Sequence, residues 1–166
     1  DSDGIARVME AAIKHALPVN MHVSGRVHMA DHIARKFPDA QVIVDHLGLK
    51  QPHEPPPLDD PFGDLPAVLE LAQLDNIAIK ITGTCTLSKQ DYSYDDIWDP
   101  LAQVFDAFGL DRCLWGTDWT RAIKFLTYKQ GVEPFRQTDR LSDSDRAALM
   151  GGTLQKIYKW APSGNS

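Results

Sequence analysis

Asp118 is the residue whose position in the chain points most directly to chemistry. It ends the segment 114–118, whose composition predicts a short buried strand that stops at a carboxylate. An ionised carboxylate beside apolar residues is costly unless another group pairs with it or the protein uses it. Because α/β proteins bind ligands at the carboxyl ends of their strands, Asp118 is a candidate active-site group. The alternative is a structural carboxylate paired with Arg112 or Lys80.

Two histidines lie at or next to the ends of other predicted strands. His22 lies in the predicted strand 19–23, and His46 ends the predicted strand 41–46. A histidine at such a position can stabilise the negative charge that develops on an attacked carbonyl, or it can move a proton. The alternative for each is a buried histidine bonded to a backbone carbonyl. Lys80 is expected in an internal ion pair instead.

Three further side chains are candidates for substrate recognition. Arg26, Arg121 and Tyr128 are predicted on or near loops at the same end of the strands. A guanidinium group binds a carboxylate through two parallel hydrogen bonds. The sequence does not choose among these candidates.

Alternating strands and helices must position these groups. A helix begins near Asp3, and four strand–helix units follow it along the chain. The predicted strands cover residues 19–23, 41–46, 76–82 and 113–118, and the predicted helices follow them at 29–37, 64–72, 99–108 and 142–158. Such alternation predicts a parallel sheet covered by helices.

The side chains of the strands alternate between an apolar and a polar face. Ile77, Ile79 and Ile81 share one face of their strand, whereas Lys80 and Thr82 share the other. Strands buried on both faces would be apolar throughout, so the mixture favours a barrel with one face toward a lumen. We expect the polar set to point away from the helices: His22, His46, Lys80, Thr82 and Asp118.

A proline-rich loop separates the second predicted strand from the next helix. It covers residues 49–63 and contains five prolines, at positions 52, 55, 56, 57 and 61. Such a segment is stiff and non-helical, and it is too long for a simple connection. It is a lid, a spacer or an ordinary surface loop.

Composition limits the class of protein. The 166 residues are expected to form a single domain, 1–166, with a net charge of -6. This charge argues against nucleic-acid and anionic-membrane partners, and no apolar run is long enough to cross a bilayer. Cys85 and Cys113 are too few for a disulfide framework, so a reducing cytoplasm is the expected compartment.

Four motifs resemble one known family when they are taken together and in order. They are Val44-Asp45-His46-Leu47-Gly48, Lys80-Ile81-Thr82-Gly83, Phe108-Gly109-Leu110-Asp111-Arg112 and Trp115-Gly116-Thr117-Asp118-Trp119. The chain thereby resembles the C-terminal half of the amidohydrolase-related TIM-barrel hydrolases over roughly residues 18–160. The nearest branch is that of the 2-pyrone-4,6-dicarboxylate and sugar lactonases.

The resemblance implies an α/β fold with about four strand–helix units, half of a (β/α)8 barrel. It implies a hydrolase that opens a small lactone or cyclic ester, in which Asp118 activates water and His46 is the second catalytic residue. His22 would then help to polarise the substrate carbonyl. The cofactor is none, or one divalent zinc or manganese ion held by His22 and Asp118 if the protein is metal-dependent.

Several features depart from the family pattern. The His-x-His pair of the family's first strand does not occur in these 166 residues, and Thr117 and Thr120 stand where serine and proline are common. A half barrel would leave two strand edges and an apolar lumen exposed, so we expect a missing N-terminal half or a homo-oligomer as the partner. Two alternatives stay open: a metal-dependent decarboxylase or amide hydrolase of the same superfamily, and an inactive half barrel or subunit.

Overall fold

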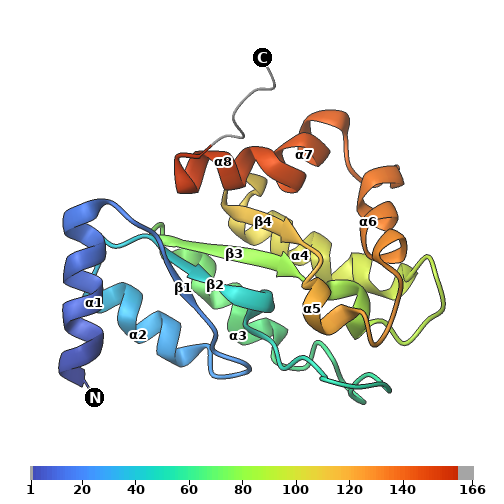
Figure 1. Ribbon diagram of the computed structural model, residues 1–166, viewed down its shortest axis with the longest axis horizontal. Helices are drawn as coiled ribbons and strands as arrows, with labels where there is room; N and C mark the ends of the chain where they lie inside the picture. The colour runs from blue at the N-terminus through green and yellow to red at the C-terminus, as the bar shows by residue number, and fades with distance from the viewer. Residues whose placement is uncertain (1, 161–166) are drawn as a thin grey trace.

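A four-stranded parallel sheet forms the centre of the molecule. The computed structural model describes residues 2–160, and its strands are β1 (Val19–Met21), β2 (Val42–Val44), β3 (Ile77–Thr82) and β4 (Cys113–Gly116). They lie in the order β1-β2-β3-β4 (Figure 1). Val42 is opposite both Val19 and Ile77, and Ile79 is opposite both Val44 and Cys113. The predicted parallel sheet is confirmed.

Helices and short turns connect the strands. The helices are α1 (Ser2–His15), α2 (His28–Lys36), α3 (Leu65–Glu70), α4 (Trp98–Phe108), α5 (Trp119–Ala122), α6 (Tyr128–Gln137), α7 (Asp143–Ala147) and α8 (Thr153–Tyr158). The shorter turns are η1 (Asp45–Gly48), η2 (Leu71–Gln73), η3 (Thr84–Leu87), η4 (Asp95–Ile97), η5 (Leu110–Arg112) and η6 (Ala148–Gly152). The predicted last helix is therefore divided, because η6 is a π-helical turn between α7 and α8.

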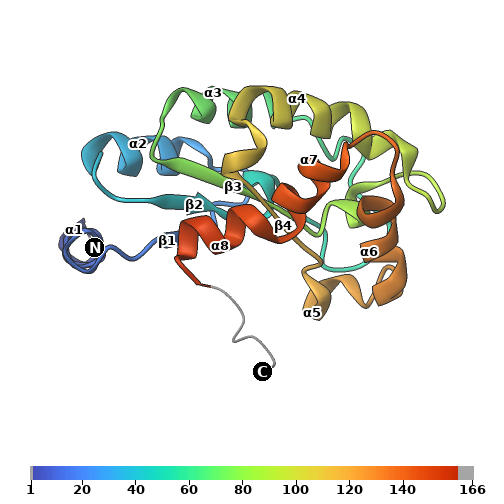
Figure 2. The ribbon, with the colours of Figure 1, turned by 90° about the horizontal axis from the view of Figure 1, so that it is seen from above.

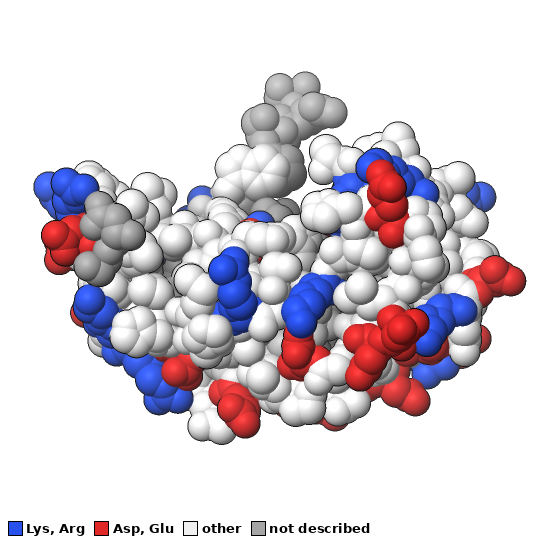
Figure 3. All heavy atoms as spheres, turned by 90° about the horizontal axis from the view of Figure 1, so that it is seen from below, with Lys and Arg blue, Asp and Glu red and all other residues white. Residues whose placement is uncertain are grey.

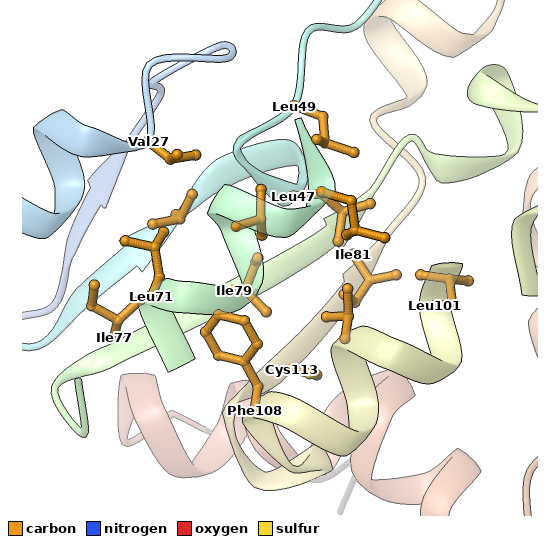
Figure 4. Packing of buried hydrophobic residues seen from close by; sticks show 14 of the residues in the cluster. Val27, Leu47, Leu49, Leu71, Ile77, Ile79, Ile81, Leu101, Phe108 and Cys113 are labelled. Carbon is orange, nitrogen blue, oxygen red and sulfur yellow. The ribbon is translucent and has the colours of Figure 1, made fainter. Parts of the chain in front are cut away.

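One face of the sheet carries the main core. Helices α2, α3 and α4 cover it in Figure 2, and Ile77, Ile79 and Ile81 point into it from β3. Each of these isoleucines is fully buried, and Figure 4 shows Phe108 of α4 packed near Ile79. The expectation that the isoleucine face lies under the helices is therefore confirmed. Burying such side chains stabilises the fold, because it removes apolar surface from water.

The opposite face is covered by α8. Ile43, Ala78 and Leu114 share this inner face, are fully buried, and pack against side chains of α8. The helix crosses the sheet on the side away from α3 and α4 (Figure 2), and the Tyr158 hydroxyl donates a 2.8 Å hydrogen bond to Asn20 Oδ1. The expectation of an exposed apolar lumen is wrong for these three side chains, because α8 covers them and removes them from water.

Helix α1 is only partly buried. Met9 and Ala12 are buried, but Ile5 and Val8 are 45% and 56% exposed although the same apolar face includes them. A small cavity with an apolar lining lies between α1 and β1; Ile5, Met9 and Met21 are among the residues that line it. Within residues 2–160, the outer edges of β1 and β4 pair with no further strand.

Charges are mixed on the surface. Lys and Arg side chains are interspersed with Asp and Glu side chains over the face drawn in Figure 3. No helix among residues 2–160 has the length and apolar character that crossing a membrane requires.

Candidate active site

Asp118 lies just beyond the end of β4, in a rare backbone conformation. β4 ends at Gly116, two residues earlier than predicted, and Asp118 has φ 52° and ψ 45° immediately before α5. Non-glycine residues in this left-handed region cost about 1–3 kcal/mol and cluster at functional sites. The turn directs a carboxylate that is 13% exposed toward the carboxyl ends of β2 and β3.

His46 reaches the same place through a tight turn. β2 ends at Val44, so His46 is not part of a strand as predicted; it belongs to η1, with φ 55°, and Leu47 follows with φ 59°. Gly48 completes the turn with φ 68°, and a Cβ there would lie 2.8 Å from Val27 Cγ1. Consequently His46 leaves the buried face of β2 and joins the polar side chains.

Thr82 links His46 to the end of β3. The His46 backbone N–H donates to Thr82 Oγ1 over 3.2 Å, and the same hydroxyl lies 2.8 Å from His46 Nδ1. His46 Nδ1 is also 3.6 Å from Asp118 Oδ2. Nε2 of this ring has no hydrogen bond within the described part of the chain, so it is the nitrogen available to a ligand.

The pKa of His46 is lowered from its ordinary value. Burial is the main cause, because it disfavours the charged imidazolium. Asp118 and then Asp45 act in the opposite direction, while the neighbouring His22 and Arg121 lower the pKa further. The net direction favours a neutral imidazole near neutral pH.

His22 and Arg26 border the site from the carboxyl end of β1. The ring of His22 stands edge-on to that of His46, with centroids 5.4 Å apart. Arg26 is exposed, and its Nε donates to Val23 O over 3.4 Å. The structure therefore brings His22 together with His46 and leaves the end of the Arg26 guanidinium open to solvent.

Arg121 binds groups of the protein itself. Its Nε donates to Asp118 Oδ2 over 2.6 Å, and its Nη1 donates to the Pro52 carbonyl over 2.7 Å. Its Nη2 donates to Thr86 Oγ1 over 2.9 Å and to Gln51 Oε1. The partner of Asp118 is thus neither Arg112 nor Lys80. The i,i+3 spacing of a helical turn is the sequence signal that could have found it.

The other two cations have partners elsewhere. Lys80 Nζ is 2.9 Å from Asp45 Oδ1, which is the expected internal ion pair. Arg112 donates to the carbonyls of Phe108, Leu74 and Ala72. Both side chains hold the sheet and its connections together below the site.

Tyr128 packs against Trp119 at the surface. It is 55% exposed at the start of α6, and its ring stands edge-on to Trp119 with centroids 5.3 Å apart. Trp119 directly follows Asp118, so Tyr128 borders the site through that ring. Sequence reasoning missed Gln51 and Thr86, for which no signal in the chain was available.

A metal ion does not fit the described residues alone. Catalytic zinc sites use three protein ligands, and within residues 2–160 no three His, Cys, Asp or Glu side chains gather closely enough to hold an ion. His22 and Asp118 therefore do not constitute a metal site by themselves.

Comparison with known proteins identifies the family. The amidohydrolase family model matches residues 1–160. The chain belongs to this family, and its parallel sheet with covering helices corresponds to half of a (β/α)8 barrel.

Similar proteins include two curated lactone hydrolases. The chain is 30% identical to an L-fucono-1,5-lactonase of Burkholderia multivorans, with 75% of this chain and 48% of that protein covered. It is 31% identical to a 4-sulfomuconolactone hydrolase of Hydrogenophaga intermedia, with 64% of this chain and 34% of that protein covered. The chain thus spans half or less of the length of these two relatives.

A solved structure shares the fold. An amidohydrolase of Burkholderia multivorans, determined with bound zinc, matches 97% of this chain and 58% of its own with a TM-score of 0.80 at 24% identity. This likeness concerns the arrangement of the elements.

Proposed function

We propose that this chain carries part of the catalytic apparatus of a hydrolase that opens a small lactone or cyclic ester. The observation that supports this most directly is the convergence of Asp118 and His46, whose Oδ2 and Nδ1 atoms are 3.6 Å apart beyond the strand ends. The two lactone hydrolases among the similar proteins support the substrate class.

Asp118 is the general base in this proposal. Its carboxylate takes a proton from a water molecule while the water oxygen forms a bond to the lactone carbonyl carbon. When the tetrahedral intermediate collapses, the ring C–O bond breaks and the leaving oxygen takes the proton from the Asp118 carboxylic acid. Lactone and water are thereby converted into one hydroxy acid, and Asp118 is returned to its ionised form.

His46 stabilises the oxyanion. We assign the Thr82 hydroxyl as a donor to His46 Nδ1, because its oxygen already accepts from the His46 backbone N–H. The ring proton then resides on Nε2, which donates to the carbonyl oxygen as negative charge develops there. His22, whose ring adjoins His46, is a second donor to the same oxygen.

Replacing Asp118 with Asn tests the proposal. We expect the rate of lactone hydrolysis to fall by about 10²–10⁴-fold, the usual contribution of a general base. Ring opening of γ- and δ-lactones is followed by proton release, with the Lys156→Met variant as a control because Lys156 is exposed on α8 and pairs with Asp111. Unchanged hydrolysis in Asp118→Asn would overturn the mechanism, and a wild-type chain without turnover would favour an inactive or incomplete subunit.

A metal-dependent hydrolase is the second candidate, because a similar solved amidohydrolase contains zinc. With only His22 and Asp118 as ligands, we expect zinc or manganese well below one equivalent after dialysis. Elemental analysis of the wild type, His22→Ala and Asp118→Asn measures this. One equivalent that both substitutions abolish would support the metal-dependent alternative.

A further inference from the structure

Arg121 contacts the loops that follow three different strands. Its acceptors are Asp118 after β4, Thr86 after β3, and the Gln51 side chain and Pro52 carbonyl after β2. The side chain is 11% exposed. A guanidinium holds its donors in a rigid planar fork, so one residue sets the relative positions of all three loops.

The space that this guanidinium occupies depends on the absence of a side chain at Gly83. Gly83 has φ 70°, and a Cβ built there would collide with Arg121 Nη2 and lie 2.7 Å from Gln51 Oε1. Gln51 in turn donates to the carbonyls of Thr82 and His46, over 3.0 and 3.3 Å. The network therefore extends from Arg121 to the residues that hold the His46 ring.

The two oxygens of Asp118 have different surroundings. Oδ2 accepts from Arg121 Nε at 2.6 Å and faces His46 Nδ1 at 3.6 Å. Oδ1 has no hydrogen bond within residues 2–160. A carboxylate fixed through one oxygen keeps the other oriented toward a water molecule, which is the preorganisation that a general base needs.

We propose that Arg121 is a positioning residue: it fixes Asp118 through Oδ2, leaves Oδ1 to accept the water proton, and fastens the proline-rich loop 49–63 over the site. This inference rests on the proposed function for Asp118. It replaces the idea that Arg121 binds a substrate carboxylate, because four of its five N–H donors already have acceptors in the protein.

The fastened loop also shapes a cavity. A space of about 280 Å³ lies between the loop and the segments after β3 and β4, lined by Pro55, Pro57, Thr86, Tyr94 and Phe125 among others. Thr86 belongs both to this lining and to the acceptors of Arg121. The larger cavity of about 420 Å³ near Trp98 and Arg140 includes none of these groups.

Substitution of Arg121 separates positioning from substrate binding. We expect Arg121→Met to lower kcat for lactone hydrolysis by about 10²-fold, the effect of misplacing a reacting group, with a smaller change in KM. Arg121→Lys should retain part of kcat, and added guanidinium ion at millimolar concentration should restore part of it to Arg121→Met. Unchanged kcat, or a rise in KM alone, would overturn the inference.

Lys124 provides the matched control. Its Nζ is 2.9 Å from Glu54 Oε1, so Lys124 also connects the segment after β4 with the loop 49–63, but on the exposed surface. None of its contacts is with Asp118. We expect Lys124→Met to change kcat less than twofold. Loss of activity in both variants would assign the effect to the loop alone and contradict the positioning of Asp118.

Hydrogen exchange tests the fastening without any substrate. The backbone amides of residues 49–51, 53 and 54 should exchange faster in Arg121→Met than in the wild type and in Lys124→Met, because the Pro52 carbonyl and the Gln51 side chain lose their donor. Equal exchange in all three proteins would overturn this part of the inference. Inactive Asp118→Asn combined with fully active Arg121→Met would refute the inference while leaving the proposed function intact.

Discussion

The inner face of the sheet has two levels that behave differently. The lower level consists of Ile43, Ala78 and Leu114, all fully buried against α8. The upper level contains Thr82 with His46, and the Lys80–Asp45 ion pair lies between the two levels. Side chains on one face of one sheet thus change from apolar packing to charged and hydrogen-bonded contacts within two or three residues.

The two levels are therefore expected to contribute differently to stability and to the reaction. The side chains of the lower level are buried and pack against α8, so substitutions there should reduce stability through lost packing. The upper level holds groups whose hydrogen bonds are directed toward one another and toward the strand ends. Substitutions there should act on the reaction, or on the local order of loops, more than on global stability.

The largest effect on stability is expected at the lower level. Leu114→Ala should reduce the free energy of unfolding by about 2–5 kcal/mol, as large-to-small substitutions in a packed core do. Urea unfolding followed by circular dichroism measures the change. Leu17→Ala is the control, because Leu17 is 59% exposed and should change stability by about 0.5 kcal/mol or less. Similar values for the two variants would mean that α8 does not seal this level.

The ion pair between the two levels should give an intermediate effect. Lys80→Met leaves the Asp45 carboxylate, 19% exposed, without its 2.9 Å partner. We expect a loss of about 1–3 kcal/mol, the cost of an unsatisfied and partly buried group. Adding Asp45→Asn to Lys80→Met should recover part of that loss in urea unfolding. If the double variant is less stable than Lys80→Met alone, Lys80 and Asp45 do not act as an isolated ion pair.

The sequence predicted the two faces better than the ends of the strands. Alternation in β3 correctly separated Ile77, Ile79 and Ile81 from Lys80 and Thr82. It could not predict that β2 ends at Val44, because the left-handed turn at His46 depends on contacts with Thr82 and on the close approach at Gly48. Long-range contacts of this kind leave no local pattern in the chain.

The candidate site was predicted in part for the same reason. Asp118 and His46 were recognised from motifs, and the structure brings them to 3.6 Å. The roles of Gln51 and Thr86 arise from hydrogen bonds across 70 and 35 residues of sequence, which composition and periodicity do not encode. Coverage of the inner face by α8 also escaped prediction, because the π-helical turn η6 interrupts what the sequence indicates as one continuous last helix.

A smaller effect is expected at the end of α8. Tyr158→Phe removes the 2.8 Å hydrogen bond to Asn20 Oδ1 and keeps the ring against the sheet. We expect a loss of about 0.5–1.5 kcal/mol, the net value of one hydrogen bond, in urea unfolding at neutral pH. Asn20→Ala should produce a similar loss, and the double variant should add little to either. Fully additive losses would show that the two groups do not interact.

The smallest effect is expected from protonation of His46 at the upper level, since Asp118 and Asp45 oppose the burial that lowers its pKa. The folded chain binds this proton less readily than the unfolded chain, whose histidine titrates near 6.5. The contribution of His46 to stability is therefore complete above pH 6.5 and is lost as pH falls through the lower pKa of the folded state. Urea midpoints measured from pH 7.5 down to pH 5 should fall more for the wild type than for His46→Gln, which cannot titrate. Parallel curves would show that burial does not lower the pKa of His46, and the upper level would then be wetter than its contacts indicate.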